Sequence, residues 1–186
     1  MNIDPSSLMP ENVLSIDRTK PIGPLSSNGA TYTVVSEDPA SLTLTSVDLS
    51  RVNAATDILD IDVDDFARAN ELTMAAIKDI KSSGGILLDA GVALTLLANP
   101  NSIPVGWMSI AGDESSASGI EFVGTIFKKE GTEELYYLRM LSSRGVWDFY
   151  FSSVDSETEL AHLAESGKGS HIRLHRVAAV LIPENR

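Results

Sequence analysis

Short apolar and β-branched runs separated by turn sequences fill most of the chain after residue 30. Two of them, Thr31–Ser36 and Leu42–Val47, alternate polar and apolar positions on either side of the turn sequence Glu37–Ala40, which predicts a β-hairpin. Six more strands are predicted at Ile86–Asp89, Val92–Leu97, Ile103–Ile110, Ile120–Lys128, Glu134–Leu141 and Val146–Phe151. The breaks between these six are short, which favours antiparallel pairing over crossover connections.

Two segments carry helix signals. Asp62 is a predicted N-cap, residues at helical spacing run from Phe66 to Lys81, and Ser82–Gly85 supplies a stop. The second predicted helix is Ser156–Ser166, because Ser156 and Glu159 have the spacing of a capping box.

Other segments are less uniform in pattern. Ala54–Asp62 is ambiguous, and the closing run 171–182 is interpreted as a strand, with a helix capped by Ser170 as the alternative. One face of the predicted strand Val146–Phe151 carries large aromatic residues, which we expect to anchor the core: Trp147, Phe149 and Phe151.

The first 28 residues differ from the rest in composition. Prolines interrupt them at Pro5, Pro10, Pro21 and Pro24, and their apolar residues are scattered. We therefore divide the chain into an extended N-terminal arm, residues 1–28, and a single α+β domain, residues 29–186. The expected architecture of the domain is a mainly antiparallel β barrel or sandwich with two flanking helices. A length of 186 residues with 43% hydrophobic content is enough to fill one core.

The charge is strongly acidic and unevenly distributed. A net charge of −12 disfavours binding of nucleic acid over the whole surface. The segment Glu37–Asp65 holds eight acids and one arginine, whereas Gly167–Arg176 holds three basic residues and no acid. Such asymmetry permits head-to-tail contact between copies, although ordinary solvated surface is the alternative. The interface candidates are Lys168, Arg173 and Arg176 on one side and Asp57, Asp60 and Asp62 on the other.

No metal site is predicted. The acids Asp60, Asp62, Asp64 and Glu71 have calcium-loop spacing, but Asp65 stands where that loop requires glycine. His171 and His175, four residues apart, would lie about 13 Å apart on a strand. The chain contains no cysteine, so thiolate ligands are excluded.

The sequence also predicts neither a catalytic residue nor a cofactor. Gly167–Ser170 resembles part of a phosphate loop but lacks the earlier glycine of that motif, and no nucleophile elbow is present. The start of the chain lacks the pattern of a signal peptide, and the longest apolar stretch, Ile86–Ala98, is too short to span a membrane. We expect a virion or cytoplasmic location.

These features together predict a non-enzymatic structural subunit of a repeating assembly, with copies of itself and neighbouring assembly proteins as partners. Virus and phage shells and tails use arm-bearing β domains, so a virion component is the expected kind of assembly by analogy of fold. The alternatives are an acidic stand-alone binding or immunity-type inhibitor protein and, third, an enzyme whose site the sequence does not disclose.

Overall fold

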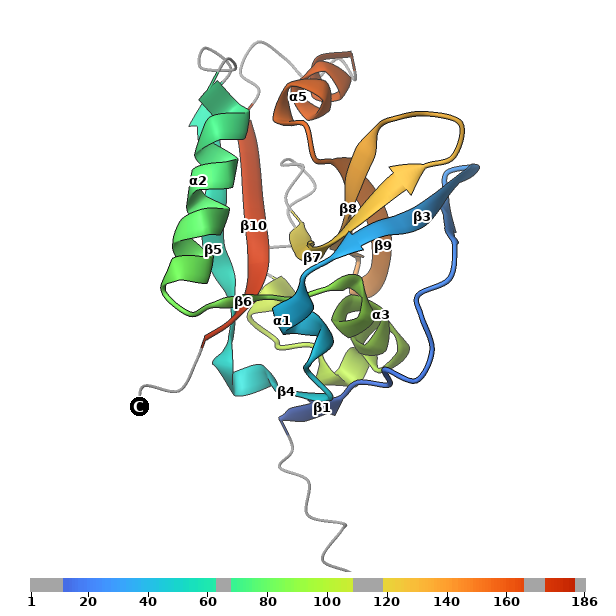
Figure 1. The fold of residues 1–186 in the computed structure, drawn as a ribbon, viewed down its shortest axis with the longest axis vertical. Helices are drawn as coiled ribbons and strands as arrows, with labels where there is room; N and C mark the ends of the chain where they lie inside the picture. The colour runs from blue at the N-terminus through green and yellow to red at the C-terminus, as the bar shows by residue number, and fades with distance from the viewer. Residues whose placement is uncertain (1–11, 63–67, 109–118, 166–172, 183–186) are drawn as a thin grey trace, which may run out of the picture.

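The computed structural model describes residues 12–62, 68–108, 119–165 and 173–182. These residues form an α+β structure in which helices surround a mixed β-sheet (Figure 1). The strands are β1 (Val13–Ser15), β2 (Leu25–Ser27), β3 (Ala30–Glu37), β4 (Ser46–Asp48), β5 (Val52–Asp62), β6 (Ile86–Leu87), β7 (Ile120–Lys129), β8 (Leu135–Ser143), β9 (Val146–Ser153) and β10 (Arg173–Leu181). The helices are α1 (Pro39–Leu42), α2 (Ala69–Ser82), α3 (Ala90–Ala98) and α5 (Ser156–Glu165), with short 3₁₀ turns at Leu49–Arg51 and Pro100–Ser102.

Strand β7 is the centre of the main sheet. On one edge it pairs antiparallel with β8, which continues to β9. Its other edge is divided: Thr125–Lys129 pair antiparallel with β3, and Ile120–Glu121 pair in parallel with β10. Strands β2 and β5 extend these two branches. Of the expected barrel or sandwich, the barrel is wrong, because two branches leave β7 and the sheet does not close. A sandwich-like α+β arrangement is compatible with the structure.

The branch point requires a glycine. Gly124 donates its N–H to Leu88 O at 3.0 Å and accepts a hydrogen bond from Asp38 N at 2.7 Å. A Cβ atom on Gly124 would lie 2.5 Å from Leu87 O. The chain around β6 thus enters between the two branches only because residue 124 has no side chain.

Several predicted elements are confirmed. Strands β7, β8 and β9 lie where their apolar runs between turn sequences predicted them, β10 is a strand, and α5 begins at Ser156. Helix α2 ends at Ser82 before Gly84, whose φ of 83° only glycine adopts easily. The start of α2 was predicted wrongly, because Asp62 pairs with Arg173 in the β5–β10 ladder and is the last residue of β5. Residues 63–67 lie outside the described residues.

Two predicted strands are not strands. Val92–Leu97 belongs to helix α3, which Asp89 caps by accepting a hydrogen bond from Val92 N at 3.0 Å. A short, continuously apolar run does not distinguish a buried helix from a buried strand by its period. Ile103–Met108 follows a 3₁₀ turn and contains turn and helical residues, while residues 109–110 lie outside the described part.

The predicted hairpin has the wrong partner. Strand β3 is present, but α1 occupies the position of the predicted turn, and β4 pairs with β1 instead. The hairpin partner of β3 is β2, joined to it through Asn28 and Gly29, which have φ values of 51° and 77°. An Asn-Gly pair with positive φ at both positions is the favoured two-residue hairpin turn.

The predicted arm boundary at residue 28 has no counterpart in the packing. Residues 12–28 follow an extended course, but Leu14 and Ile16 are each only 5% exposed and belong to the main core. Arg18 Nη1 lies 2.8 Å from the buried carboxylate of Asp89. This part of the chain is integral to the domain, whereas residues 1–11 lie outside the described residues.

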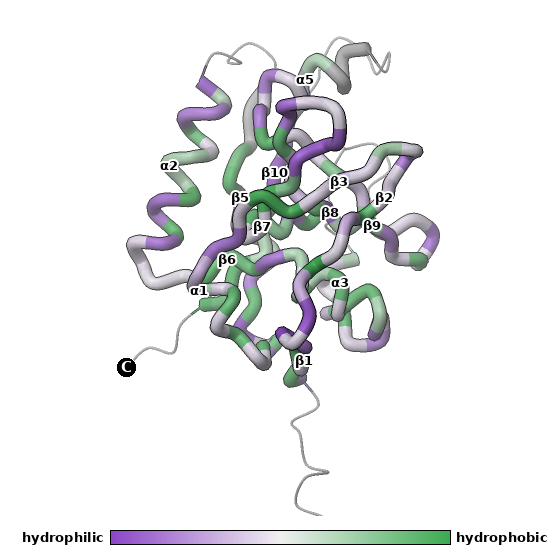
Figure 2. Tube along the Cα trace, turned by 45° about the vertical axis from the view of Figure 1, so that its right-hand side comes forward, coloured by the Kyte–Doolittle hydropathy of each residue, from purple (hydrophilic) through white to green (hydrophobic). Residues whose placement is uncertain are grey.

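The interior contains two apolar clusters. The larger lies between the sheet and α3, and the smaller lies beneath α2, whose residues alternate between hydrophilic and hydrophobic along its length (Figure 2). The aromatic face of β9 packs on the larger cluster as predicted, but Trp147, Phe149 and Phe151 are only partly buried. None of the helices in the described ranges is both long enough and apolar enough to span a bilayer.

Candidate functional site

Four charged side chains from four elements meet inside the protein. Arg176 Nε of β10 donates to Glu121 Oε2 of β7 at 3.0 Å, and Arg139 Nη2 of β8 donates to Glu121 Oε1 at 3.1 Å. Arg139 Nη2 also donates to Glu159 Oε1 of α5 at 3.0 Å. We call these four residues the buried ionic network. Arg176 is 0% and Glu121 1% exposed, so the two positive and two negative charges must compensate one another.

The surroundings favour the charged forms of Glu121 and Arg139. Burial by itself would raise the pKa of Glu121, but Arg176, Arg139 and the hydrogen bond from Ser152 Oγ outweigh it and hold that pKa below its usual value. Burial would lower the pKa of Arg139, yet the carboxylates of Glu121 and Glu159 raise it overall. The network therefore acts as a fixed set of hydrogen-bond donors and acceptors.

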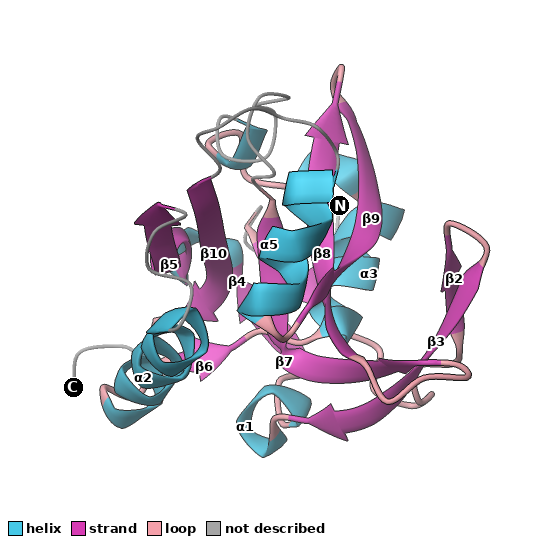
Figure 3. Cartoon of the chain, turned by 90° about the horizontal axis from the view of Figure 1, so that it is seen from above, coloured by secondary structure: helices cyan, strands magenta, loops and turns pink. Residues whose placement is uncertain are grey.

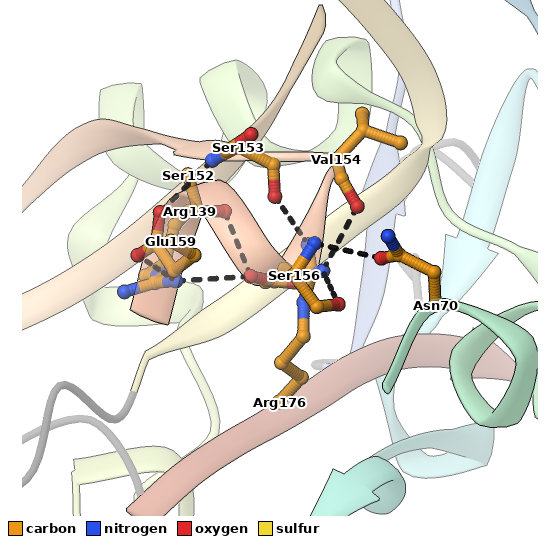
Figure 4. Close-up of polar contacts among 9 residues, drawn as sticks. Asn70, Arg139, Ser152, Ser153, Val154, Ser156, Glu159 and Arg176 are labelled. Atoms are coloured by element: carbon orange, nitrogen blue, oxygen red, sulfur yellow. Dashed lines mark hydrogen bonds and ion pairs between the residues drawn. The ribbon is translucent and has the colours of Figure 1, made fainter. Parts of the chain in front are cut away.

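Hydrogen bonds from the buried ionic network hold the connection between β9 and α5. Arg176 donates to Ser153 O at 2.9 Å, to Val154 O at 3.2 Å and to Ser156 Oγ at 3.0 Å (Figure 4). Glu159 Oε2 accepts from Ser153 N at 3.0 Å. Ser156 and Glu159 therefore face the network and do not form the predicted capping box with each other.

Asp155 caps α5 instead. Its carboxylate accepts hydrogen bonds from Glu157 N at 3.1 Å and Thr158 Oγ1 at 2.6 Å. Asn70 of α2 joins the same turn, donating to Asp155 Oδ1 at 2.6 Å and accepting from Ser156 N at 2.7 Å. Hydrogen bonds from Arg176 of β10 and with Asn70 of α2 thus fix the connection between β9 and α5.

This fixed connection forms one wall of a cavity of about 580 Å³. The first turns of α2 form the second wall and the turn into β8 forms the third, and Figure 3 shows α5 between α2 and β8. The surface of the cavity is mainly apolar. Its lining residues are Asn70, Thr73, Met74, Glu133, Glu134, Leu135, Ser153, Val154, Asp155 and Thr158.

A second cavity of about 240 Å³ continues along α2 on the other side of Met74. Its floor is formed by side chains of β7 and β8, including Val123, Ile126 and Tyr137. Lys81 and Asp38, whose charged groups lie 2.6 Å apart, stand at its edge. We call the two cavities together the α2 groove, with Met74 as the residue they share.

The larger cavity combines an apolar surface with two polar features. The Thr73 hydroxyl, on a residue only 2% exposed, is the one buried side-chain polar group without a hydrogen-bond partner in the described part of the chain. The lining also includes three carboxylates, those of Glu133, Glu134 and Asp155. Burial would raise the pKa of Asp155, but hydrogen bonds from Thr158 and Asn70 outweigh it and lower that pKa.

The structure places five of the six predicted interface residues, all except Lys168, in one sheet. Arg173 stands opposite Asp62 and His175 opposite Asp60 in the β5–β10 ladder. Asp57 is exposed, and its Oδ1 lies 2.7 Å from Nε2 of His175. Acidic and basic segments predicted to meet between copies are therefore neighbours within one chain.

Arg176 requires a correction, because its side chain is fully buried and is not available to a neighbouring copy. Its burial depends on Glu121, which is distant in sequence, so the local charge pattern gave no sign of it. Lys168 lies outside the described residues. A contact between copies through Lys168 or Arg173 stays a prediction.

The predicted absence of a calcium site also stays a prediction. Asp60 and Asp62 lie on β5 and Glu71 lies in α2, while Asp64 and Asp65 fall outside the described residues, as do His171 and Gly167–Ser170. Within the described ranges, no three acidic or histidine side chains are grouped as a metal site requires.

Sequence reasoning missed both the network and the groove. Glu121 and Arg139 are directly opposed across β7 and β8, a relation that only the register reveals. One local signal was available, because a charged residue interrupts the apolar run of each of these strands. Comparison with protein-family models, with curated protein sequences and with solved structures finds no match for this chain, so its function is argued from this site alone.

Proposed function

We propose that this chain is a non-enzymatic subunit of a repeating protein assembly, and that it receives an extended segment of a neighbouring copy in the α2 groove. The observation that carries the proposal is the pair of cavities, about 580 and 240 Å³, which lie beside successive turns of α2 and share Met74 in their linings. The larger has the volume of an ordinary ligand site, and its surface is mainly apolar.

The shape of the groove favours a chain segment over a compact ligand. Successive pockets along one helix suit the successive side chains of a bound peptide. Met74, which separates the pockets, is 57% exposed and has the flexible thioether side chain that adapts to a bound partner. Leu135, at the rim of the larger cavity, is 38% exposed.

The chemistry of the larger cavity favours binding over catalysis. Asp155 already accepts hydrogen bonds from Asn70, Glu157 and Thr158, and its pKa is lowered. A general acid or base that works near neutral pH needs a carboxyl pKa that is raised. Asp155 is therefore suited to remain a fixed negative charge.

In a repeating assembly, the α2 groove would supply apolar burial between copies. Copies that each carry a charge of −12 repel one another, so apolar burial must supply most of their affinity. A segment of a neighbour that fills the groove would supply such burial without requiring a large flat interface. A virion shell or tail is the kind of assembly that we propose; the analogy now rests on the β-rich domain alone, because residues 12–28 are part of its core.

The test compares two lysine substitutions on α2. Met74→Lys places a charge in the middle of the groove, while Leu72→Lys, at a 39% exposed residue that lines neither cavity, is the matched control. Sedimentation velocity over a concentration series should show assembly of the wild type and of Leu72→Lys, and at least about tenfold weaker assembly of Met74→Lys. A wild type that stays monomeric, or equal assembly of both variants, would overturn the proposal.

A further inference from the structure

We infer that the segment held in the α2 groove is the stretch of residues 1–11 of a neighbouring copy, with Leu8 and Met9 in the larger cavity. This inference rests on the proposed binding role of the groove, to which it adds the identity of the bound segment. Residues 1–11 precede the described part of the chain, and the groove lies within that part.

The composition of residues 1–11 suits an apolar groove better than that of the other stretches outside the described residues. The stretches 63–67, 109–118 and 166–172 each join two described segments, and residues 183–186 contain no large apolar side chain. Residues 1–11 adjoin the described residues on one side only, and they contain four large apolar side chains: Met1, Ile3, Leu8 and Met9. They are therefore the stretch that combines apolar side chains with the freedom to extend to another copy.

The charge of the segment also suits the larger cavity. The six residues Pro5–Pro10 contain no charged side chain. The carboxylates of Glu133, Glu134 and Asp155 in the lining already have partners within the protein, so the cavity does not require a charged ligand. An uncharged segment adds apolar burial without the cost of removing a further charge from water.

Two prolines favour an extended form of this segment. Pro5 and Pro10 each fix their own φ near −65°, and the residue before a proline is disfavoured in a helix. Because these angles are restricted beforehand, binding costs less conformational entropy. Successive side chains of an extended chain point to opposite sides, so Leu8 and Met9 would contact opposite walls of the groove. Helix α2 supplies Met74 to one wall, and β8 supplies apolar surface to another.

The position of β1 favours the groove of a neighbour over the groove of the same chain. Leu8 precedes Asn12, the first described residue, by four residues, so the two lie at most about 14 Å apart. In Figure 1, β1 lies at the lower end of the molecule and α5, whose start forms a wall of the larger cavity, lies at the upper end. A domain of this length has a radius of gyration of about 16 Å, so opposite ends are much more than 14 Å apart.

A donor segment at one end and a receiving groove at the other give a head-to-tail contact. Each copy then uses two different surfaces, and both stay available for a further copy at the ends of the array. Contacts of this kind close into a ring or continue as a filament, whereas a two-fold contact stops at a dimer. The inferred contact is therefore one that can propagate through a repeating assembly.

The first experiment removes the two apolar anchors from the full chain without changing its charge. Leu8→Ser with Met9→Ser should weaken assembly in sedimentation velocity at least about tenfold, with an unchanged thermal midpoint by circular dichroism. Val105→Ser with Met108→Ser is the matched control, because these residues are 84% and 44% exposed and line neither cavity. Equal assembly of the two double variants would overturn the inference.

The second experiment mixes two defective chains. The Met74→Lys chain keeps its segment but has a blocked groove, and the chain with Leu8→Ser and Met9→Ser keeps its groove but lacks the anchors. Each should assemble poorly alone. Their mixture should form a one-to-one complex that does not grow, because only one segment and one groove remain intact in each pair. Failure of the two chains to form this complex would contradict the inference.

The third experiment traps the contact covalently, which is possible because the chain has no cysteine of its own. A disulfide requires Cβ atoms about 3.5–4.5 Å apart. Under oxidised glutathione, a Leu8→Cys chain should therefore form a disulfide with a Met74→Cys chain several-fold faster than with a Leu72→Cys chain. Leu72 is 39% exposed and lines neither cavity. Equal rates of crosslinking would mean that Leu8 does not enter the groove.

The outcomes separate the two proposals. If the wild type stays monomeric, or if Met74→Lys assembles as the wild type does, the groove is not an interface between copies and both proposals fail. If Met74→Lys is defective but Leu8→Ser with Met9→Ser assembles normally, only the identity of the segment is overturned. The occupant of the groove would then be another stretch of the chain.

Discussion

At the scale of the residue, Arg176 shows how one buried charge organises its surroundings. Its guanidinium donates to Glu121, to Ser156 and to the carbonyls of Ser153 and Val154, so it both neutralises a carboxylate and positions the wall of the α2 groove. A buried charge that loses its partner is far more costly than a surface charge that does so.

Arg176→Met should therefore destabilise the protein strongly. Glu121 would keep only Arg139 as an ionic partner, and breaking a buried ion pair typically costs about 3–5 kcal/mol. Urea unfolding measures the change, with Lys78→Met at an exposed residue of α2 as the control. A loss below about 1 kcal/mol would mean that Arg176 is not buried as described.

The same variant should change the response to acid. The folded-state pKa of Glu121 is lowered, so its contribution to stability is present above its ordinary pKa of 4.5 and is lost as pH falls through the lowered value. Arg176 is the strongest charge that lowers this pKa. Acid unfolding of Arg176→Met should consequently begin at higher pH than in the wild type. Adding Glu121→Gln to Arg176→Met should remove that difference, since no carboxyl remains to titrate.

Thr73→Val tests the unpartnered hydroxyl directly. An unsatisfied buried hydroxyl costs about 1–3 kcal/mol, so valine of nearly equal shape should raise the free energy of unfolding by about 1 kcal/mol in the absence of ligand. Thr95→Val is the control, because the Thr95 hydroxyl donates to Gly91 O at 2.7 Å and its removal should bring no gain. Equal effects of the two substitutions in thermal unfolding would contradict the prediction.

At the scale of the element, the position of β7 between two branches determines the strand order of the sheet. The chain around β6 passes so close to Gly124 that any side chain there would meet the backbone of Leu87 and Leu88. Backbone atoms held by strand pairing do not move aside as a flexible side chain does.

Gly124→Ala should accordingly cost about 1–3 kcal/mol or more, the usual range for forced overpacking. Gly106→Ala is the matched control, because a Cβ atom there would meet nothing within 4 Å. The free energies of unfolding from urea titrations distinguish the two. If both variants unfold at the wild-type midpoint, the close passage of β6 over β7 is wrong.

At the scale of the whole molecule, the N-terminal segment is part of the domain. Leu14 and Ile16 are buried in the main core, and Arg18 neutralises the fully buried Asp89, which also accepts from Ser41 Oγ at 2.8 Å.

Removal of residues 1–28 should therefore lower the thermal midpoint markedly. Each buried large aliphatic side chain contributes about 1.5–3 kcal/mol, and Asp89 would lose its ionic partner as well. The comparison is a chain that starts at residue 12, which keeps the buried aliphatic side chains and the ion pair of Asp89. Its thermal midpoint should lie well above that of the chain lacking residues 1–28. Circular dichroism measures both midpoints, and equal midpoints would mean that residues 12–28 do not contribute to the core.

The predicted charge contact between copies now involves only Lys168 and Arg173. Lys168→Glu with Arg173→Glu should slow association at low salt, because complementary charges on two copies raise the rate of their encounter. Lys20→Glu with Lys78→Glu, two exposed lysines elsewhere, is the charge-matched control. Light scattering should separate the two pairs, and identical association rates would remove this contact.

The sequence by itself determined those elements whose information is local. The short apolar and β-branched runs of β7, β8 and β9, the apolar closing run of β10, and the serine and acidic residues at the start of α5 are readable within about ten residues. The capping box predicted from that serine and acid nevertheless does not form. The glycine stop of α2 is likewise a property of one residue and its neighbours.

Only the tertiary structure decided the rest, because the decisive contacts join residues far apart in the chain. Val92–Leu97 is helical because Asp89 caps it and the sheet covers it, not because of its period. The pairing of β5 with β10 brings the acidic and basic segments together in one chain. Arg176 is interior rather than exposed because β7 places Glu121 beside it. The α2 groove exists only where α2, β8 and the start of α5 meet in space, a juxtaposition that no local pattern encodes.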